Sequence, residues 1–231
     1  RWIPEHPTAM SYMRLWKEYP FLTYFKNSII LTAATLFVSA IIGSMANYIL
    51  AKYTFKGKSF VYILFLAGMM IPIQTVIIPL AFTFGKLGIV DNLPVLVLLY
   101  SAFCLSMTVF IVTGYMKGLP DELEEAAVMD GAGHGIIFFR IILPLSMPAI
   151  ASASIFNFVS AWNNLLFPLV FISKDSMKTI SIGLLSFFGA YTSDYGAVMA
   201  AIGVSIIPPI IMYILLQEKM EKGLTAGAVK G

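Results

Sequence analysis

Five stretches of this chain contain no aspartate, glutamate, lysine or arginine. They are residues 27–51, 59–85, 92–116, 141–173 and 195–217. A bilayer core of about 30 Å is crossed by roughly 20 helical residues, because an α-helix rises about 1.5 Å per residue. Every stretch reaches that length, whereas the buried helices of soluble proteins account for apolar runs of roughly 10–14 residues. The sequence therefore predicts an all-α, polytopic bundle of transmembrane helices with five visible spans.

The composition and charge of the chain agree with that prediction and exclude several classes of protein. Hydrophobic residues make up 59% of the sequence and charged residues only 12%, whereas soluble domains are about half apolar and about a quarter charged. The net charge of +3 is spread over the loops, so it indicates no nucleic-acid partner. The single cysteine, Cys104, permits no internal disulfide, and the two histidines form no metal-binding pattern.

The positions of the prolines refine the predicted spans. The stretch 141–173 is too long for one perpendicular helix and contains three prolines. We therefore expect an approach segment, a helix from about Pro148, and an exit. The Pro208-Pro209 pair is expected to kink the last span. Because the chain starts at Arg1 and not at a methionine, we also expect an upstream segment, which could hold a signal peptide or another span.

Basic residues in the loops predict the orientation in the membrane. Alternating spans place the loop 52–58, the insert 117–140 and the tail 218–231 on one side, and these segments share eight lysines and arginines. The two other loops between spans carry three, and the N-terminal segment adds four to that second side. Because cytoplasmic loops are richer in lysine and arginine, we expect the insert and the tail to be cytoplasmic.

The predicted spans lack the groups that ion-coupled or nucleotide-driven chemistry needs. Proton and ion pumps usually carry acidic or basic residues in their membrane segments, and the five stretches here have none. Gly57-Lys58-Ser59 resembles the end of a phosphate-binding loop, but that pattern requires a glycine at the position of Lys52. Any uphill transport is therefore expected to draw its energy from another protein.

Uncharged polar residues recur on one face of the fourth predicted span. Ser154, Asn157, Ser160 and Asn164 follow one another at steps of three, three and four residues, and Asn163 adds another amide. Small polar residues commonly form hydrogen bonds between membrane helices. The same stripe would suit a pathway for an uncharged, hydroxylated solute, so the pattern alone leaves both interpretations open.

The insert between the third and fourth spans begins like a surface helix. Pro120 is followed by acidic residues, which are favourable at the positive N-terminal end of a helix. Leu123, Ala126 and Ala127 are expected on one side, at i, i+3 and i+4. Alanines on an exposed face would let another protein surface approach the backbone closely.

The second half of the insert is expected to turn back towards the membrane. Gly131 can end the first helix in a left-handed conformation. A second short helix, 135–142, is expected to stop at Leu143-Pro144. The resulting helix–turn–helix is either a packed loop or a docking element that passes motion between a soluble partner and the spans.

The residues of this insert resemble the EAA signature of ABC importer permeases. The matching residues are Glu125, Ala126, Ala127, Asp130, Gly131, Ala132, Phe138 or Phe139, Ile141 or Ile142, Leu143, Pro144 and Leu145. Two other segments narrow the resemblance to the maltose-type sugar permeases. Residues 162–168 are similar to their fifth helix, and 223–231 are similar to the C-terminus of their smaller subunit. The similarity covers nearly the whole chain. It departs from the family at the N-terminus, where the resemblance implies a sixth span upstream of the five visible ones.

This resemblance implies one permease domain, 1–231, with a cytoplasmic coupling loop at 117–144 and a tail at 218–231. In this family two unlike permease subunits form the pathway, two ATPase subunits bind ATP and Mg²⁺, and an extracytoplasmic protein delivers the sugar. The chain itself would bind no cofactor and would lie in a prokaryotic cell membrane, in contact with lipid. The residues implied to contact an ATPase are Glu125, Ala126, Ala127, Asp130, Gly131 and Ala132, with Leu143 and Pro144 marking the return to the membrane.

Two alternatives differ from this interpretation in cargo or in class. The EAA signature also occurs in importers of peptides, osmolytes and ions, although the sugar-type C-terminus argues against them. A polytopic membrane enzyme would need catalytic polar groups gathered near one interface, and the sequence shows no such group. A signalling subunit would use the insert to bind a regulator without any solute flux.

Overall fold

The computed structural model describes residues 8–186 and 194–228, with side chains described as far as residue 218. All regular structure in these residues is helical, and three segments are long and apolar enough to cross a bilayer. They are α2 (Phe21–Lys52), α5 (Leu93–Lys117), and Tyr195–Glu218, which joins α12 (Tyr195–Ser205) to the first half of α13 (Ile207–Ala228). Two bent helix pairs raise the number to five if each pair is one span. The predicted all-α membrane bundle is confirmed.

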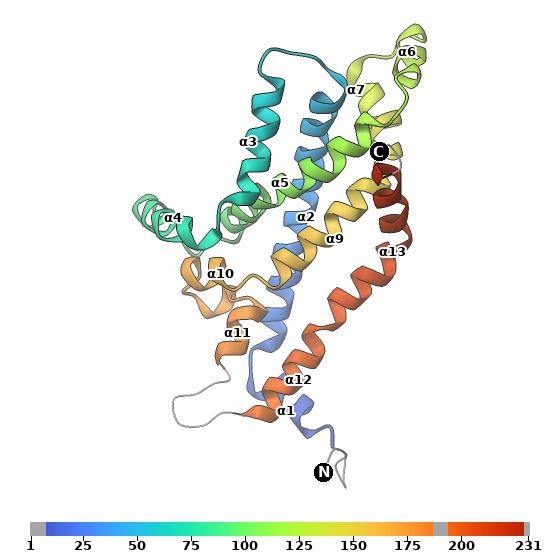
Figure 1. Cartoon of the computed structure of the whole chain (residues 1–231). Helices are drawn as coiled ribbons and strands as arrows, with labels where there is room; N and C mark the ends of the chain where they lie inside the picture. Colours follow the sequence, from blue (N-terminus) through green and yellow to red (C-terminus); the bar gives the residue numbers. More distant parts are fainter. Residues whose placement is uncertain (1–7, 187–193, 229–231) are drawn as a thin grey trace.

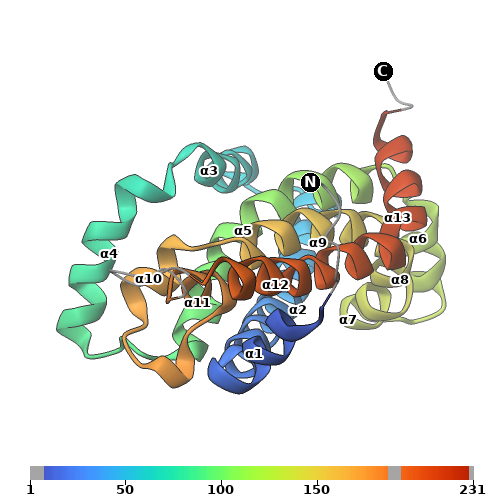
Figure 2. The ribbon, with the colours of Figure 1, turned by 90° about the horizontal axis from the view of Figure 1, so that it is seen from below.

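The second predicted span, 59–85, is wrong as a single helix. It consists of α3 (Lys58–Met70) and α4 (Ile73–Leu87), which meet at an angle of 97°. The break lies at Ile71, whose ψ of 113° is extended because the ring of the following Pro72 disfavours the helical conformation. As a result α4 leaves the bundle sideways, as Figures 1 and 2 show.

The fourth span is approached by a helix that runs further than predicted. After α7 (His134–Ile137) comes a π-helical turn, η1 (Phe138–Ile142), followed by α8 (Leu143–Leu145). The predicted stop at Leu143-Pro144 is wrong, because Pro144 lies in the first turn of α8, where its missing N–H is harmless. The direction changes by 69° at Ser146, and α9 (Met147–Trp162) begins close to the predicted Pro148.

The last span has a one-residue interruption near the proline pair at which a kink is predicted, but Tyr195–Glu218 is not among the sharply bent helix pairs. The helix breaks at Ile206, between α12 and α13. Pro209 has no N–H to donate to the carbonyl of Ser205, four residues earlier. The indole Nε1 of Trp162 in α9 donates to that carbonyl instead, at 3.2 Å. The proline therefore leaves the Ser205 carbonyl free to accept the hydrogen bond that joins α9 to the last span.

The centre of the bundle is the packing of α2 against α5, with α9 beside them and α13 against α9 (Figure 1). Small side chains allow the close approach: a Cβ atom added at Gly43 of α2 would lie 2.6 Å from Cγ2 of Thr108 in α5. Asn47 crosses the same interface, because its Nδ2 donates to the carbonyl of Thr108 and its Oδ1 accepts from Thr113. Hydrogen-bonded amides and close backbones are typical of packed membrane helices.

Two loops are fastened to each other at the end of the molecule away from α6 (Glu122–Met129). The carboxylate of Asp91, which follows α4, accepts from the backbone N–H groups of Ser173 and Lys174 at 2.6 and 2.9 Å. These hydrogen bonds favour the ionised form, so they lower the pKa of Asp91 below its ordinary value. Ser173 and Lys174 follow α10 (Leu166–Phe171) and precede η2 (Asp175–Met177) and α11 (Ile180–Ser186).

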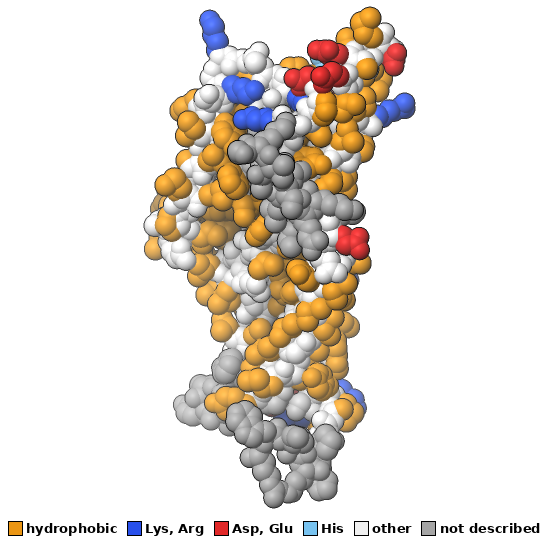
Figure 3. Space-filling model, turned by 45° about the vertical axis from the view of Figure 1, so that its right-hand side comes forward, with side chains coloured by type: hydrophobic (Ala, Val, Ile, Leu, Met, Phe, Trp, Pro, Cys, Tyr) orange, Lys and Arg blue, Asp and Glu red, His pale blue; other side chains and the backbone are white. Residues whose placement is uncertain are grey.

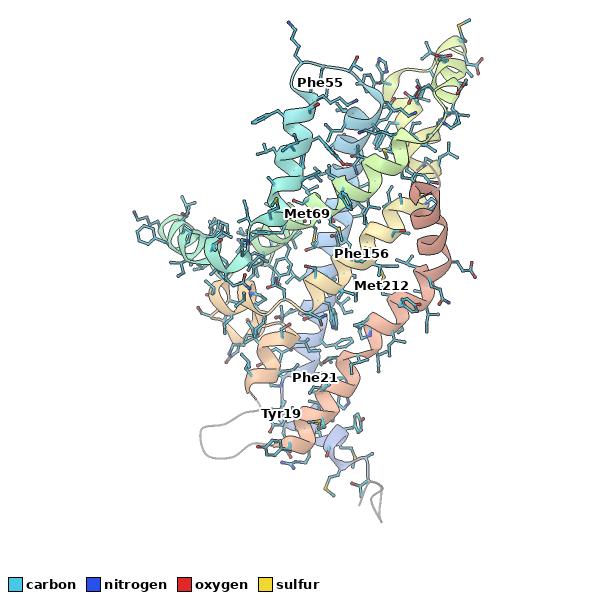
Figure 4. All side chains as sticks on the ribbon, in the orientation of Figure 1. Tyr19, Phe21, Phe55, Met69, Phe156 and Met212 are labelled. Carbon is cyan, nitrogen blue, oxygen red and sulfur yellow. The ribbon has the colours of Figure 1, made fainter. Side chains whose placement is uncertain are left out.

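The surface of the bundle is apolar along much of its length. In the face shown in Figure 3, charged side chains gather at the end formed by α6 and the α2–α3 loop, and hydrophobic side chains cover much of the surface below. Figure 4 labels aromatic residues at both ends: Phe55 near α3, and Tyr19 and Phe21 beside α1 (Met10–Glu18). This distribution is typical of a membrane protein, with aromatic side chains near the two interfaces.

Candidate coupling surface

The first helix of the insert, α6, begins as the sequence predicts. Its first turn contains Glu122, Glu124 and Glu125. No side chain caps the free N–H groups at this end, so the carboxylates stabilise the helix through the field of its aligned peptide dipoles. The acidic turn therefore marks the start of α6 and leaves negative charge on the surface of the loop.

The predicted role of Gly131 in ending α6 is confirmed. Gly131 has a φ of +79°, a left-handed conformation that residues with a Cβ atom rarely adopt. Its N–H donates to the carbonyl of Val128, and the N–H of Ala132 donates to the carbonyl of Ala127, each at 2.9 Å. This pair of hydrogen bonds is the Schellman motif, which turns the chain sharply after the helix.

The two alanines of the insert do not share an exposed face, which corrects the sequence prediction. Ala127 is only 8% exposed and packs in one cluster with Met116 of α5 and Ile137 of α7. Glu125 and Ala126 are exposed. Successive helical residues are about 100° apart, so one residue can pack inward while its neighbour faces outward. Ala127 therefore holds the loop on the spans, and Ala126 is open to another molecule.

Apolar side chains are exposed over the loop. Met129 is 87% exposed at the end of α6, and Val128, Ile136 and Phe139 are also exposed. Asp130 beside them is exposed and acidic. A group of protruding apolar side chains rimmed by charge is typical of a surface that a partner covers.

A buried lysine at the end of α2 anchors the loop. Nζ of Lys52 donates to the carbonyl of Leu119 and to Oδ1 of Asp121, both at 2.6 Å, and the Lys52 side chain is only 4% exposed. This ion pair lowers the pKa of Asp121 below its ordinary value. One turn earlier in α2, the Tyr48 hydroxyl donates to Oε2 of Glu124 at 2.9 Å. No local sequence pattern pairs these residues, since 69 positions separate Lys52 from Asp121 and 76 separate Tyr48 from Glu124.

The predicted return to the membrane lies at the base of the same structure. Leu143 is half-buried and packs against the cluster that contains Ala127, whereas Pro144 is exposed. Both lie in α8, just before the bend at Ser146. The segment from α6 to α8 thus folds back on the ends of α2 and α5 as one packed unit.

The polar stripe predicted on the fourth span divides into groups with different surroundings. Asn157 is buried and its Nδ2 donates to Oγ1 of Thr108 at 2.9 Å, which is a hydrogen bond between α9 and α5. Oδ1 of Asn164 accepts from the N–H of Phe167 and so begins the turn into α10. The two remaining groups are the half-buried Ser154, and the exposed pair Ser160 and Asn163.

A cavity of about 480 Å³ lies beside the end of α9, between α11 and the last span. Its polar groups are largely engaged within the chain: the indole of Trp162 bonds to Ser205, and the Ser181 hydroxyl donates to the carbonyl of Trp162. Asn163 also lines the cavity. No group of three or more His, Cys, Asp or Glu side chains within residues 8–186 and 194–218 is arranged to hold a metal ion.

The sequence pattern of one protein family matches residues 39–226, and its description is "Binding-protein-dependent transport system inner membrane component". This chain belongs to that family. It is 38% identical to a putative ABC transporter permease protein, ORF2, of a Caldicellulosiruptor species, over 99% of this chain and 83% of the relative. It is 36% identical to the arabinooligosaccharides transport system permease protein AraQ of Halalkalibacterium halodurans, over 90% of this chain and 74% of that protein.

The fold of this ABC importer permease matches that of a solved relative. The crystal structure of a bacterial ABC transporter that imports the acidic polysaccharide alginate aligns with a TM-score of 0.78, at 24% identity, over 91% of this chain and 79% of the other. The chain is therefore a multi-pass transport subunit of a prokaryotic inner membrane. The family match includes α6 to α9, and so the whole candidate coupling surface.

Proposed function

We propose that this permease works with a second permease, two ATPase subunits and an extracytoplasmic binding protein, and that the loop 117–144 receives the motion of an ATPase. The observation that carries the proposal is the geometry of α6. Its outer side presents Ala126 and Met129 to another molecule, while Ala127 and Lys52 fasten its inner side to the spans. A displacement of α6 by a partner would therefore be transmitted directly to α2 and α5.

The cargo that this proposal assigns is an oligosaccharide. Relatives that cover most of this chain include a diacetylchitobiose uptake permease of Streptomyces coelicolor, NgcG, at 32% identity, besides the arabinooligosaccharide permease. The charge-free spans agree with a neutral, hydroxylated solute, because they hold no group that would require a counter-ion. Energy would come from ATP and Mg²⁺ bound by the ATPase partners on the cytoplasmic side, where the loop 117–144 is also proposed to lie.

The pathway is proposed to run along the open face of α9. Phe156, Val159, Ser160 and Asn163 are exposed and follow the i, i+3, i+4, i+7 pattern of one helical face. Ser160 and Asn163 would offer hydrogen bonds to a passing sugar, with Ser154 further along the helix. Asn157 and Asn164 would shape the pathway by fixing α9 against α5 and α10. The second permease would close this face.

The tail 218–231 is proposed to reach the ATPase pair as a further contact. The backbone of α13 is helical as far as Ala228, and residues 229–231 lie outside the described residues. The tail, the loop 117–144 and the spans are proposed to form one permease domain, 1–231. Deletion of residues 225–231 is expected to lower the ATPase rate of the assembled transporter, and an unchanged rate would contradict this contact.

The proposal is tested with two substitutions on the loop. In Ala126→Arg a long charged side chain occupies the open side of α6, and in Gly131→Val a branched side chain is forced into the left-handed region. We expect both variants to insert normally and to lower uptake on the order of tenfold, the size of effect found at interface hot spots. Uptake is measured in proteoliposomes with labelled diacetylchitobiose and labelled arabinooligosaccharides.

The matched control is Ala9→Arg, which places the same side chain on an exposed alanine next to α1, at the other end of the molecule. It is expected to leave uptake unchanged. Normal uptake in both loop variants would contradict the coupling role of the loop. Failure of the wild-type assembly to import either sugar would contradict the assigned cargo.

A further inference from the structure

Both helices of the coupling loop are joined to α2 by one line of side chains. Glu124 of α6 accepts from the Tyr48 hydroxyl at 2.9 Å. The hydroxyl oxygens of Tyr48 and Tyr53 are 3.2 Å apart, and the Tyr53 hydroxyl lies 2.8 Å from Nδ1 of His134 at the start of α7. The Tyr53 ring makes edge-on contacts with the rings of Tyr48 and His134. These four residues are called the Glu124–His134 chain below.

The direction of each hydrogen bond in this chain follows from its acidic end. A carboxylate has no hydrogen to donate, so Tyr48 must donate to Glu124. Tyr48 has only one hydroxyl hydrogen, so its oxygen must accept from Tyr53. Tyr53 has then donated its own hydrogen, and its oxygen must accept from His134. Three bonds made together therefore require a hydrogen on Nδ1 of that imidazole.

The surroundings of Glu124 favour an ionised carboxylate, which can only accept hydrogen bonds. Its side chain is 18% exposed, and Oε1 lies 4.0 Å from the ammonium group of Lys52. Oε1 is buried and has no hydrogen-bond partner among the described residues, so the nearby positive charge is what balances it. Oε2 is directed at Tyr48, which is itself buried. Lys52 is shared with Asp121, so the acidic turn is held at two points.

We infer that the Glu124–His134 chain positions both helices of the loop on the end of α2, and that His134 carries its hydrogen on Nδ1. α6 is held through Glu124 and α7 through His134, so a displacement of one is passed through the tyrosines to the other and to α2. The inference rests on the proposed function only for its effect on transport. The tautomer of His134 follows from the hydrogen-bond geometry and the ionised Glu124, without the proposed function.

The tautomer is measured by ¹⁵N solid-state NMR of histidine-labelled transporter in lipid nanodiscs at about pH 8.5, where an ordinary imidazole is neutral. The signals of His134 are assigned by their loss in His134→Gln. We expect a protonated Nδ1 and an unprotonated Nε2 in the wild type. An unprotonated Nδ1 in the wild type would overturn the inference.

Removing one hydroxyl group tests the direction of the hydrogen bonds in the Glu124–His134 chain. In Tyr48→Phe the ring packing on Tyr53 and Phe138 is kept, but Tyr53 is free to donate to His134. We therefore expect the hydrogen of the imidazole to move to Nε2 in this variant. Tyr195→Phe removes an exposed hydroxyl at the other end of the molecule and is expected to keep the wild-type signals. A wild-type tautomer in Tyr48→Phe would overturn the inference.

The effect on transport is measured as labelled sugar imported per ATP hydrolysed, using diacetylchitobiose or arabinooligosaccharide, whichever the wild-type assembly imports. For Tyr48→Phe and Tyr53→Phe we expect this ratio to fall about tenfold, as for the loss of a hydrogen bond to a charged group. The yield of assembled transporter is expected to stay unchanged, and Tyr195→Phe is expected to keep the wild-type ratio. A normal ratio in both Tyr48→Phe and Tyr53→Phe would overturn the positioning role. A wild-type assembly that imports neither sugar would contradict only the proposed function.

Discussion

The α2–α5 pair and the α3–α4 arm are similarly apolar in sequence, yet they have opposite roles in the fold. α2 and α5 bury residues along their whole lengths, whereas no residue in α3 or α4 is buried. Thr35, Ser39, Gly43 and Asn47 of α2 are buried at steps of four residues, a stripe of small and polar side chains. Apolar character therefore identifies the membrane segments, and the small-residue stripe identifies the pair that packs most extensively.

The arm exposes large apolar side chains, as the outer faces of α2 and α5 also do. Ile78 of α4 is 75% exposed, and Met70 and Phe82 are exposed as well. In a bilayer such side chains contact lipid without cost. Other α4 residues, Leu80 and Phe84 among them, are partly buried against the cluster that contains Phe171. Under the proposed function the arm is also the part of this subunit free to contact a second permease.

The largest contrast between the two regions is expected from enlarging a helical glycine. Gly43→Leu introduces a side chain where a Cβ atom already comes within 2.6 Å of Thr108, so the backbones of α2 and α5 must separate. We expect a loss of about 3 kcal/mol in the free energy of unfolding. Gly85→Leu in α4 is the matched control, because a Cβ atom there meets nothing within 4 Å. Steric trapping in bicelles measures both, and equal losses would contradict the contrast.

A smaller contrast is expected from removing an apolar side chain. Leu96 of α5 is buried and Ile78 of α4 is exposed. Leu96→Ala leaves a cavity whose walls lose van der Waals contacts, which we expect to cost about 2 kcal/mol of unfolding free energy. Ile78→Ala leaves a space that lipid fills, and its effect is expected to stay within about 0.5 kcal/mol. The same unfolding assay compares them, and a larger effect for Ile78→Ala than for Leu96→Ala would contradict the contrast.

The smallest contrast is expected from removing a side-chain amide. Asn47 hydrogen-bonds to Thr108 and Thr113 across the α2–α5 interface, whereas Gln74 of α4 is exposed. We expect Asn47→Leu to lower the unfolding free energy by about 1 kcal/mol, within the range for hydrogen bonds between membrane helices. A double-mutant cycle with Thr113→Val isolates the pair. Gln74→Leu is expected to be neutral or stabilising. A coupling energy of zero in the cycle would show that the Asn47–Thr113 hydrogen bond does not stabilise the fold.

The parts of the fold that depend on neighbouring residues could be predicted from the sequence. Charge-free stretches located α2, α5 and the last span, and Gly131 marked the end of α6. The bend between α3 and α4 could also have been predicted, because Pro72 is a local signal of a helix break. The prediction of one continuous span did not take it into account. Hydrophobic periodicity, helix caps and prolines act over a few neighbouring residues. The features named above can therefore be predicted without knowledge of distant contacts.

The parts of the candidate site that depend on distant residues could not be predicted. Lys52 meets Asp121 only because α2 and α5 end side by side, and no local pattern pairs them. Ala126 and Ala127 are the same residue type at adjacent positions, so only the packing on Met116 and Ile137 decides which one is exposed. Likewise Asn157 and Ser160 belong to one sequence stripe, and the position of α5 separates their surroundings.

The most direct test of the account is photo-crosslinking from α6 in the assembled transporter. A benzophenone amino acid replaces Met129, which is 87% exposed at the end of the loop, and in a second variant it replaces Ile78 on the α3–α4 arm. The account predicts that the probe at 129 crosslinks to an ATPase subunit and that the probe at 78 does not. A probe at 129 that reaches only lipid or another permease, in a transporter that still imports sugar, would contradict the claim that this loop receives the motion of the ATPase.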